Sequence, residues 1–212
     1  TETRDDYSLD LTVPFTAWGG RSAQFKAGGA WARTERRFNE RLFEYNSTVL
    51  RYDGDEQAFL RDSQVGQVDP ATGRFRSGQL YLVETSSLGN SYFGDQKVRA
   101  WYGMVDLSLT RSLRLIGGLR RESTALDVRS RDPRRRAGQL DNNDNLPSAS
   151  VVLALTDRMN LRAAVTRTIA RPNFREIADY TSFEFVGDFV YIGNPNLRRT
   201  TIDNYALRWE WF

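Results

Sequence analysis

Residues 7–15 read Tyr-Ser-Leu-Asp-Leu-Thr-Val-Pro-Phe, with an apolar side chain at every odd position. Successive side chains of a β-strand point to opposite faces, so this stretch predicts a strand with one apolar and one mostly polar face. Further rows with the same period begin at residues 23, 101, 113, 149, 159 and 205. No stretch has the period of an amphipathic helix, and we therefore predict an all-β fold of about seven antiparallel strands.

The connections between these rows alternate in length. We expect one domain over residues 1–212, with strands near 6–16, 22–45, 96–109, 112–128, 147–156, 159–171 and 203–212. Tight turns near 17–21, 110–112 and 156–158 alternate with long polar loops near 46–95, 129–146 and 172–202. Outer-membrane barrels have short periplasmic turns and long extracellular loops in this way. The spacing thus favours the up-and-down wall of an antiparallel transmembrane β-barrel, with the apolar rows toward lipid.

The composition excludes several functions. The 212 residues include 30 basic and 27 acidic side chains, and a net charge of +3 does not favour a nucleic-acid partner. Histidine and cysteine are absent, which excludes most zinc sites, thiol nucleophiles, disulfides and Ser-His-Asp triads. We find no nucleophile elbow, P-loop or dinucleotide fingerprint. Residues 53–56 and 141–145 are acidic, but they lack the spacing of a calcium loop. We expect no enzyme activity, no catalytic residues, no metal and no cofactor.

The hydropathy is compatible with two other kinds of protein. The mean hydropathy is −0.57 and no apolar run has the length of a transmembrane helix, which is typical of a soluble protein. A soluble or surface-exposed β-rich binding module gives the same alternation if its apolar row packs inward. A small passive outer-membrane barrel would give it as well. Aromatic residues near the tight turns favour a membrane interface; they are Phe15, Trp18, Trp209, Trp211 and Phe212.

Several phrases of the sequence resemble one family. Residues 166–176 (TRTIARPNFRE), 193–197 (GNPNL) and 203–205 (DNY) are similar to the barrel of TonB-dependent outer-membrane receptors. Segments 36–43, 92–97 and 117–124 resemble the same family, so the resemblance covers nearly the whole chain. The family's barrel has about 22 strands around a plug. Because the chain has about seven strands and shows no plug, TonB-contacting box or signal peptide, we expect an internal piece of a larger barrel.

The resemblance implies a function in transport. Members of the family import a scarce ligand across the bacterial outer membrane, such as a ferric siderophore, a cobalamin-like compound or an oligosaccharide. The expected partners are outer-membrane lipid and lipopolysaccharide, the plug domain, the TonB complex and a small ligand that the sequence does not identify. In this mechanism the extracellular loops capture the ligand, and the TonB complex pulls on the plug to open a path.

Candidate ligand-binding residues lie in the expected extracellular loops: Arg134, Arg135, Arg136, Tyr180 and Phe183. The three arginines could hold lipopolysaccharide phosphates or an anionic ferric chelate through bidentate contacts, or could form a solvated loop. The aromatic residues between 180 and 191 could stack on a ligand. They could equally form a local hairpin, which their period of two favours.

A second set of candidates is charged and lies opposite the apolar rows, where a barrel has its lumen: Arg114, Arg120, Glu122, Arg162, Arg208 and Glu210. An unpaired charge in a confined lumen is costly. We therefore expect arginine–carboxylate pairing across neighbouring strands, with a structural role before any role in transport.

Overall fold

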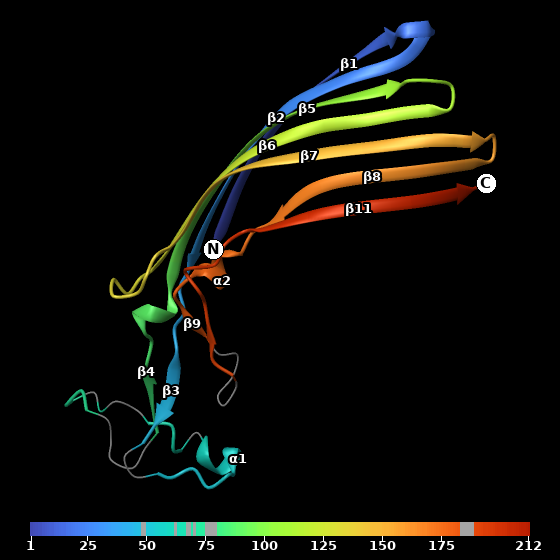
Figure 1. Ribbon diagram of the computed structural model, residues 1–212. Coiled ribbons are helices and arrows are strands. Elements are labelled where there is room, and N and C mark those ends of the chain that lie inside the picture. Colours follow the sequence, from blue (N-terminus) through green and yellow to red (C-terminus); the bar gives the residue numbers. More distant parts are fainter. Residues whose placement is uncertain (48–49, 62, 67–68, 70, 75–79, 183–188) are drawn as a thin grey trace.

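One large antiparallel sheet dominates the computed structural model, which describes residues 1–212 except 48–49, 62, 67–68, 70, 75–79 and 183–188. Within the described residues, seven long strands follow the order β1-β2-β5-β6-β7-β8-β11 (Figure 1). The sheet is open, because β1 and β11 each pair with a single neighbour in it. The strands are β1 (Glu2–Ala17), β2 (Arg21–Phe38), β5 (Tyr92–Ser108), β6 (Leu113–Ser130), β7 (Gly138–Thr156), β8 (Met159–Ala170) and β11 (Thr200–Trp211). The predicted all-β, up-and-down wall is confirmed.

The smaller elements belong to the connections. β3 (Phe43–Asn46) pairs with β4 (Tyr81–Glu84), and β9 (Thr181–Ser182) pairs with β10 (Tyr191–Ile192). The described helices are short: η1 (Trp18–Gly20), α1 (Glu56–Phe59), η2 (Leu88–Asn90) and α2 (Phe174–Ile177). Within the part of the chain that the structure describes, no helix has the length and apolar character needed to cross a membrane.

The strand registers sort the side chains onto two faces. Along the ladders, odd residues pair with odd ones and even with even, apart from an irregularity where β7 ends. All seven apolar rows of the sequence therefore lie on one face, which we call the odd-numbered face. It is exposed: Leu9 is 79%, Tyr205 80% and Leu207 75% accessible. Such a surface is far too apolar and too continuous for a protein surrounded by water.

The apolar rows form a band between two belts of aromatic residues. One belt, near the tight turns, contains Phe15, Trp18, Trp209 and Trp211, and the rings of the last two lie 6.2 Å apart. The other belt contains Tyr7, Trp31, Trp101 and Tyr205, and Tyr7 and Trp31 lie 5.5 Å apart. Eight residues separate the belts on β1, or about 26 Å along the strand at a rise of about 3.3 Å per residue. Strands of outer-membrane barrels are tilted by about 35–45°, so this length corresponds to a band about 20 Å tall, against about 25 Å between the aromatic girdles of such barrels.

The tight turns lie where the sequence predicts them. The β1–β2 turn requires glycine, since Gly19 and Gly20 have φ of 72° and 70°, in the left-handed region. The β5–β6 turn occupies residues 109–112, and residues 157–158 join β7 to β8. These turns lie at one end of the sheet, and the longer connections lie at the other (Figure 1).

The structure differs most from the predicted strand bounds in two places. The segment predicted as a loop at 129–146 is mostly strand, because β6 continues to Ser130 and β7 begins at Gly138. Residues 139–145 are rich in Asp and Asn, which are rare in strands, so their pattern is typical of a loop. The strand predicted at 22–45 is two strands: β2 ends at Phe38, and Phe43–Asn46 pairs with β4 instead.

Candidate functional site

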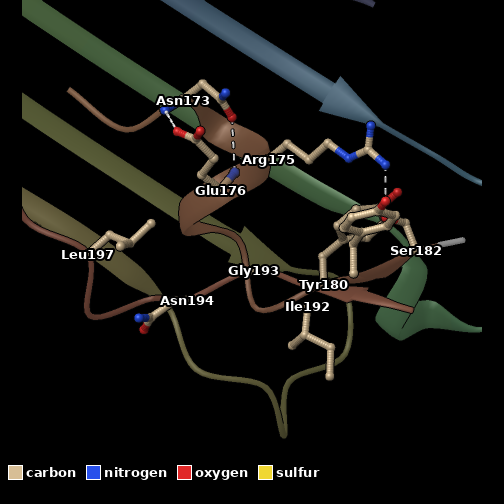
Figure 2. Close-up of a pocket in the computed structure, with 10 residues that line it drawn as sticks. Asn173, Arg175, Glu176, Tyr180, Ser182, Ile192, Gly193, Asn194 and Leu197 are labelled. Carbon is tan, nitrogen blue, oxygen red and sulfur yellow. Dashed lines mark hydrogen bonds between the residues drawn. The ribbon is translucent and has the colours of Figure 1, made fainter. Parts of the chain in front are cut away.

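A segment between β8 and β11 folds back onto the even-numbered face of the sheet. We call its described residues, 171–182 and 191–199, the inner segment. Its short helix α2 begins with a capping box (Figure 2). Asn173 Oδ1 accepts from the backbone N–H of Glu176 at 2.9 Å, and Glu176 Oε2 accepts from the N–H of Asn173 at 2.8 Å. These bonds satisfy two donors that a helix N-terminus leaves unpaired, so the Arg-Pro-Asn-Phe-Arg-Glu phrase specifies this turn locally.

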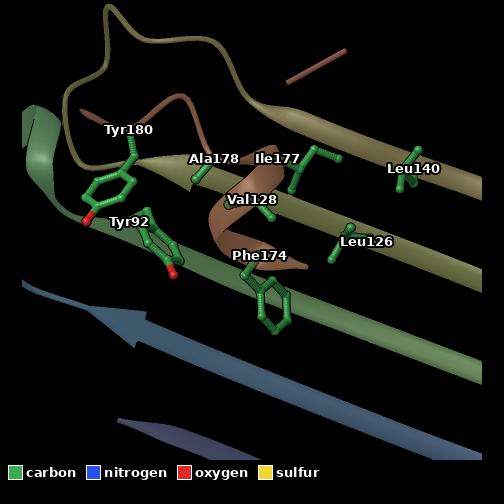
Figure 3. Packing of buried hydrophobic residues seen from close by; sticks show 8 residues of the cluster. All are labelled: Tyr92, Leu126, Val128, Leu140, Phe174, Ile177, Ala178 and Tyr180. Atoms are coloured by element: carbon green, nitrogen blue, oxygen red, sulfur yellow. The ribbon is translucent and has the colours of Figure 1, made fainter. Parts of the chain in front are cut away.

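The inner segment covers an apolar cluster on the wall (Figure 3). Its members are Phe174, Ile177, Ala178 and Tyr180 from the segment, and Tyr92, Leu126, Val128 and Leu140 from the strands. Phe174 reaches the sheet because residue 94 is glycine: a Cβ there would lie 2.4 Å from Phe174 Cδ1. Gly138 gives the same access to Ile177, whose carbonyl oxygen would lie 2.6 Å from a Cβ. The cluster therefore fixes the segment against β5, β6 and β7.

Two buried carboxylates fasten the ends of the inner segment to the wall. Arg171 pairs with Glu122 of β6, and its Nε donates to Thr124 Oγ1 at 3.0 Å. Arg199 pairs with Asp144 of β7 at 2.6 Å. Glu122 and Asp144 are each only 6% exposed. A carboxylate at such depth is strongly destabilising unless it is paired. Asp144 has its ion-pair partner among the described residues in Arg199, whereas Glu122 is paired both by Arg171 and by Arg120 of its own strand.

A cavity of about 560 Å³ lies within the inner segment, between α2 and the β9–β10 hairpin (Figure 2). Arg175 lies at its edge and donates from Nη2 to Ser182 Oγ at 2.9 Å. Gly193 lets the chain pass close to α2, because a Cβ there would collide with the carbonyl of Ala178. The lining combines amide, hydroxyl, charged, aromatic and aliphatic side chains, which suits a ligand with both polar and apolar parts. It consists of Asn173, Arg175, Glu176, Tyr180, Ser182, Tyr191, Ile192, Gly193, Asn194 and Leu197.

The charged residues expected in the lumen all lie on the even-numbered face, the side that carries the inner segment. Arg114 binds Asp106 of the neighbouring strand in a bidentate pair, at 2.7 and 2.5 Å. Arg162 pairs across strands with Glu210 at 2.8 Å. Arg120 and Arg208 instead pair along their own strands, with Glu122 at 2.9 Å and Glu210 at 3.1 Å. The expected pairing across strands is thus found for Arg114 and Arg162. Arg120 and Arg208 each pair instead with a carboxylate two residues further along the same strand.

The three loop arginines have different surroundings. Arg134 pairs with Asp132 at 3.0 Å, and its hydrogen bonds hold the pKa of that carboxyl below its usual range. Arg135 reaches Asp179 of the inner segment at 3.0 Å, and the backbone N–H of Arg136 donates to the same carboxylate at 3.1 Å. The Arg136 guanidinium has no partner within the described ranges. The loop is therefore tied to the inner segment, and Arg136 keeps its charge available.

The aromatic candidates separate into two groups. Tyr180 is only 3% exposed and belongs to the apolar cluster, although it also borders the cavity. Tyr191 pairs with Ser182 in the β9–β10 ladder, as a hairpin here requires, and Tyr191 is 53% exposed. Phe183 lies outside the described residues.

The sequence interpretation missed several residues of the site. Two of them are ion-pair partners of named candidates: Asp106 pairs with Arg114, and Arg171 pairs with Glu122. The other two, Asp144 and Arg199, pair with each other, and both were placed in loops. Arg171 lies in the Ala-Arg-Pro phrase on which the resemblance was based, and an arginine before a proline at a strand end was the one signal that could have drawn attention to it. The pair of Arg199 and Asp144 joins residues 55 positions apart and has no local signal.

Comparison with known proteins agrees with this geometry. The family model described as "TonB dependent receptor-like, beta-barrel" matches residues 1–212. No curated protein matches the chain. Barrels of this family lie in the bacterial outer membrane and serve transport, which fits an exposed apolar band and a polar opposite face. With an open antiparallel wall, tight turns at one end and the family model matching throughout, the chain belongs to the TonB-dependent receptor-like β-barrel family.

Proposed function

We propose that the chain forms part of the wall of an outer-membrane receptor that imports a scarce ligand in a TonB-dependent manner. The observation that carries this proposal is the division of one sheet into two faces. The odd-numbered face has an apolar band between two aromatic belts, and the even-numbered face has paired charges. We assign the first face to lipid and the second to the lumen, where a plug would lie.

The inner segment serves this function as a fixed part of the lumen wall. A ligand path needs groups that hold their positions while a plug rearranges, and sites built on supported elements are more exact than sites on free loops. The apolar cluster and the two buried ion pairs supply that support. Tyr191, Ile192 and Asn194 are exposed residues that line the cavity beside α2.

The cavity supports ligand capture by mixed contacts. Its exposed tyrosine, Tyr191, can stack on a ring and donate a hydrogen bond, and its amides can bind hydroxyl or carbonyl groups. A ferric siderophore, a cobalamin-like compound and an oligosaccharide all have such groups. Arg136 and the neighbouring loop add positive charge at the same end of the sheet.

Uptake by whole cells tests the proposal. Mass spectrometry of the protein purified from outer membranes first identifies the bound ligand. A strain that depends on the protein for growth on this ligand should then lose uptake of the ligand when TonB is deleted. Tyr191→Ala should weaken ligand binding about tenfold, the loss typical of one aromatic contact. Phe43→Ala, a change of similar size on β3 outside the cavity, is the matched control. Uptake that persists without TonB would indicate a passive barrel, and a protein that stays folded and monomeric without detergent would indicate a soluble module.

A further inference from the structure

The odd-numbered face carries arginines beyond the apolar band, on the side away from the tight turns, and most have a carboxylate partner. Arg33 pairs with Asp95 at 2.9 Å, Arg129 with Asp127 at 2.6 Å and Arg167 with Asp203 at 2.6 Å. An exposed pair of this kind contributes little stability, but it leaves little net charge for a further ligand. Paired arginines are thus the rule on this part of the face.

Arg99 and Arg121 depart from that rule. Both are exposed, and neither has an ion pair or side-chain hydrogen bond within the described part of the chain. The nearest acid along β5 on this face is Asp95, four residues from Arg99, and it already binds Arg33 and Lys97. These two arginines therefore form a local positive site.

The register brings the two arginines together at the edge of the apolar band. Arg121 lies opposite Trp101 in the β5–β6 ladder, and Arg99 lies two residues further along the same face of β5. Diagonal neighbours of this kind lie about 7–8 Å apart, within the combined reach of two arginine side chains. Arg99 also lies opposite Trp31 in the β2–β5 ladder. The pair of guanidinium groups is thus flanked by two indole rings of the aromatic belt.

We propose that Arg99 and Arg121 bind the phosphate of a membrane-lipid headgroup, while the lipid's acyl chains lie along the apolar band. Guanidinium groups bind phosphate in a bidentate manner, and two of them can share its oxygens. The position of the site favours a lipid over free phosphate, because the exposed ring of Trp101 and the band begin directly beside it. The face on which the lipid would lie is the one that the proposed function assigns to the bilayer, so this inference rests on that assignment.

Lipid retention tests the site. The protein purified from outer membranes in mild detergent is stripped of lipid, incubated with diphosphoryl lipid A or with its dephosphorylated form, and measured by native mass spectrometry. A second arm adds inorganic phosphate as competitor. The test variant is Arg99→Gln with Arg121→Gln. The control variant is Arg111→Gln with Arg158→Gln, which removes the same charge from exposed positions in the tight turns.

The expected result is retention of the phosphorylated lipid by the unchanged protein and by the control variant, with binding about tenfold or more weaker in the test variant, as expected for lost charge-assisted contacts. The dephosphorylated lipid should bind weakly to all three. Equal retention by the two variants would overturn the site, and so would full displacement by millimolar inorganic phosphate, which would indicate a free anion instead. Failure of the unchanged protein to enter membranes would overturn the proposed function itself, which separates the two outcomes.

Discussion

Replacing Gly94 by alanine should loosen the inner segment and leave the sheet in place. A Cβ at residue 94 would lie 2.4 Å from Cδ1 and 2.8 Å from Cε1 of Phe174, so the ring must leave its present position. Overpacking of this kind costs about 1–3 kcal/mol. The strand itself gains, because alanine is less flexible than glycine in an extended backbone. The cost therefore falls on the attachment of α2.

Hydrogen exchange measures that attachment directly. The amides of Ile177 and Ala178 donate within α2, to Asn173 at 3.3 Å and Phe174 at 3.0 Å. A cost of about 1–3 kcal/mol corresponds to exchange roughly 5- to 150-fold faster at these amides if they exchange by local opening. Gly117→Ala is the matched control, since a Cβ there would meet only the carbonyl oxygen of Ser148 at 3.9 Å. Equal exchange in the two variants would refute the reasoning that Phe174 docks through the space at residue 94.

Other changes test the ion pairs and buried hydroxyls. Arg199→Gln should release the end of the inner segment and raise its tryptic cleavage severalfold, because Asp144 is left buried without its partner. Adding Asp144→Asn should restore much of the resistance to trypsin, and a double variant that is cleaved as fast as Arg199→Gln would contradict the role of the ion pair. Tyr92→Phe should leave the melting temperature unchanged or raise it, because the buried hydroxyl of Tyr92 has no hydrogen-bond partner among the described residues. Tyr102→Phe should lower the melting temperature, because it removes a hydrogen bond of 2.7 Å to Asp10. The hydrogen bonds from Arg41 and Ser86 lower the pKa of Glu84 from 4.5 to about 2. The pair should therefore contribute above pH 4.5 and be lost as pH falls through about 2, and Arg41→Gln should return the carboxyl titration seen by NMR toward 4.5.

The sequence allowed the strands of the apolar band to be predicted in detail. Apolar side chains recur at every second position in the rows from residues 7, 113 and 205, so each row lies on one face of the sheet. The family was likewise recognisable from local phrases. Both predictions are confirmed because each depends on residues that are close together in the chain.

Beyond the apolar band, on the side away from the tight turns, the apolar residues switch to the other face of the sheet. The predicted strand bounds were wrong there. On β6 the apolar residues move to even positions at Leu126 and Val128, because the inner segment covers that face while the odd positions meet water. Residues 139–145 of β7 are polar on the outer side for the same reason. The sequence of such a strand, which is polar on its outer side, is typical of a loop unless the segment that covers its other side is known.

The site was predicted in part. Arg114 and Glu122 were named as charges opposite the apolar rows, and they lie on the even-numbered face with partners in place. Their partners depend on contacts between distant segments, as for Arg171 with Glu122, and no spacing in the sequence specifies those contacts. Burial of Tyr180 follows from the same fold-back, which a loop-based expectation of ligand contact did not include.

The central claim is that the odd-numbered face of the sheet meets lipid. The chain has no cysteine, so single cysteines placed in turn at residues 113–121 of β6 and carrying a nitroxide label report each position separately. In the protein reconstituted into bilayers, labels at Leu113, Leu115, Gly117 and Leu119 should collide with oxygen dissolved in lipid, and those at Arg114, Ile116, Gly118 and Arg120 should be shielded from it. The label at residue 121 should become accessible to a water-soluble nickel reagent on the outer side. An equal response at odd and even positions, or oxygen access on the even side, would contradict the claim.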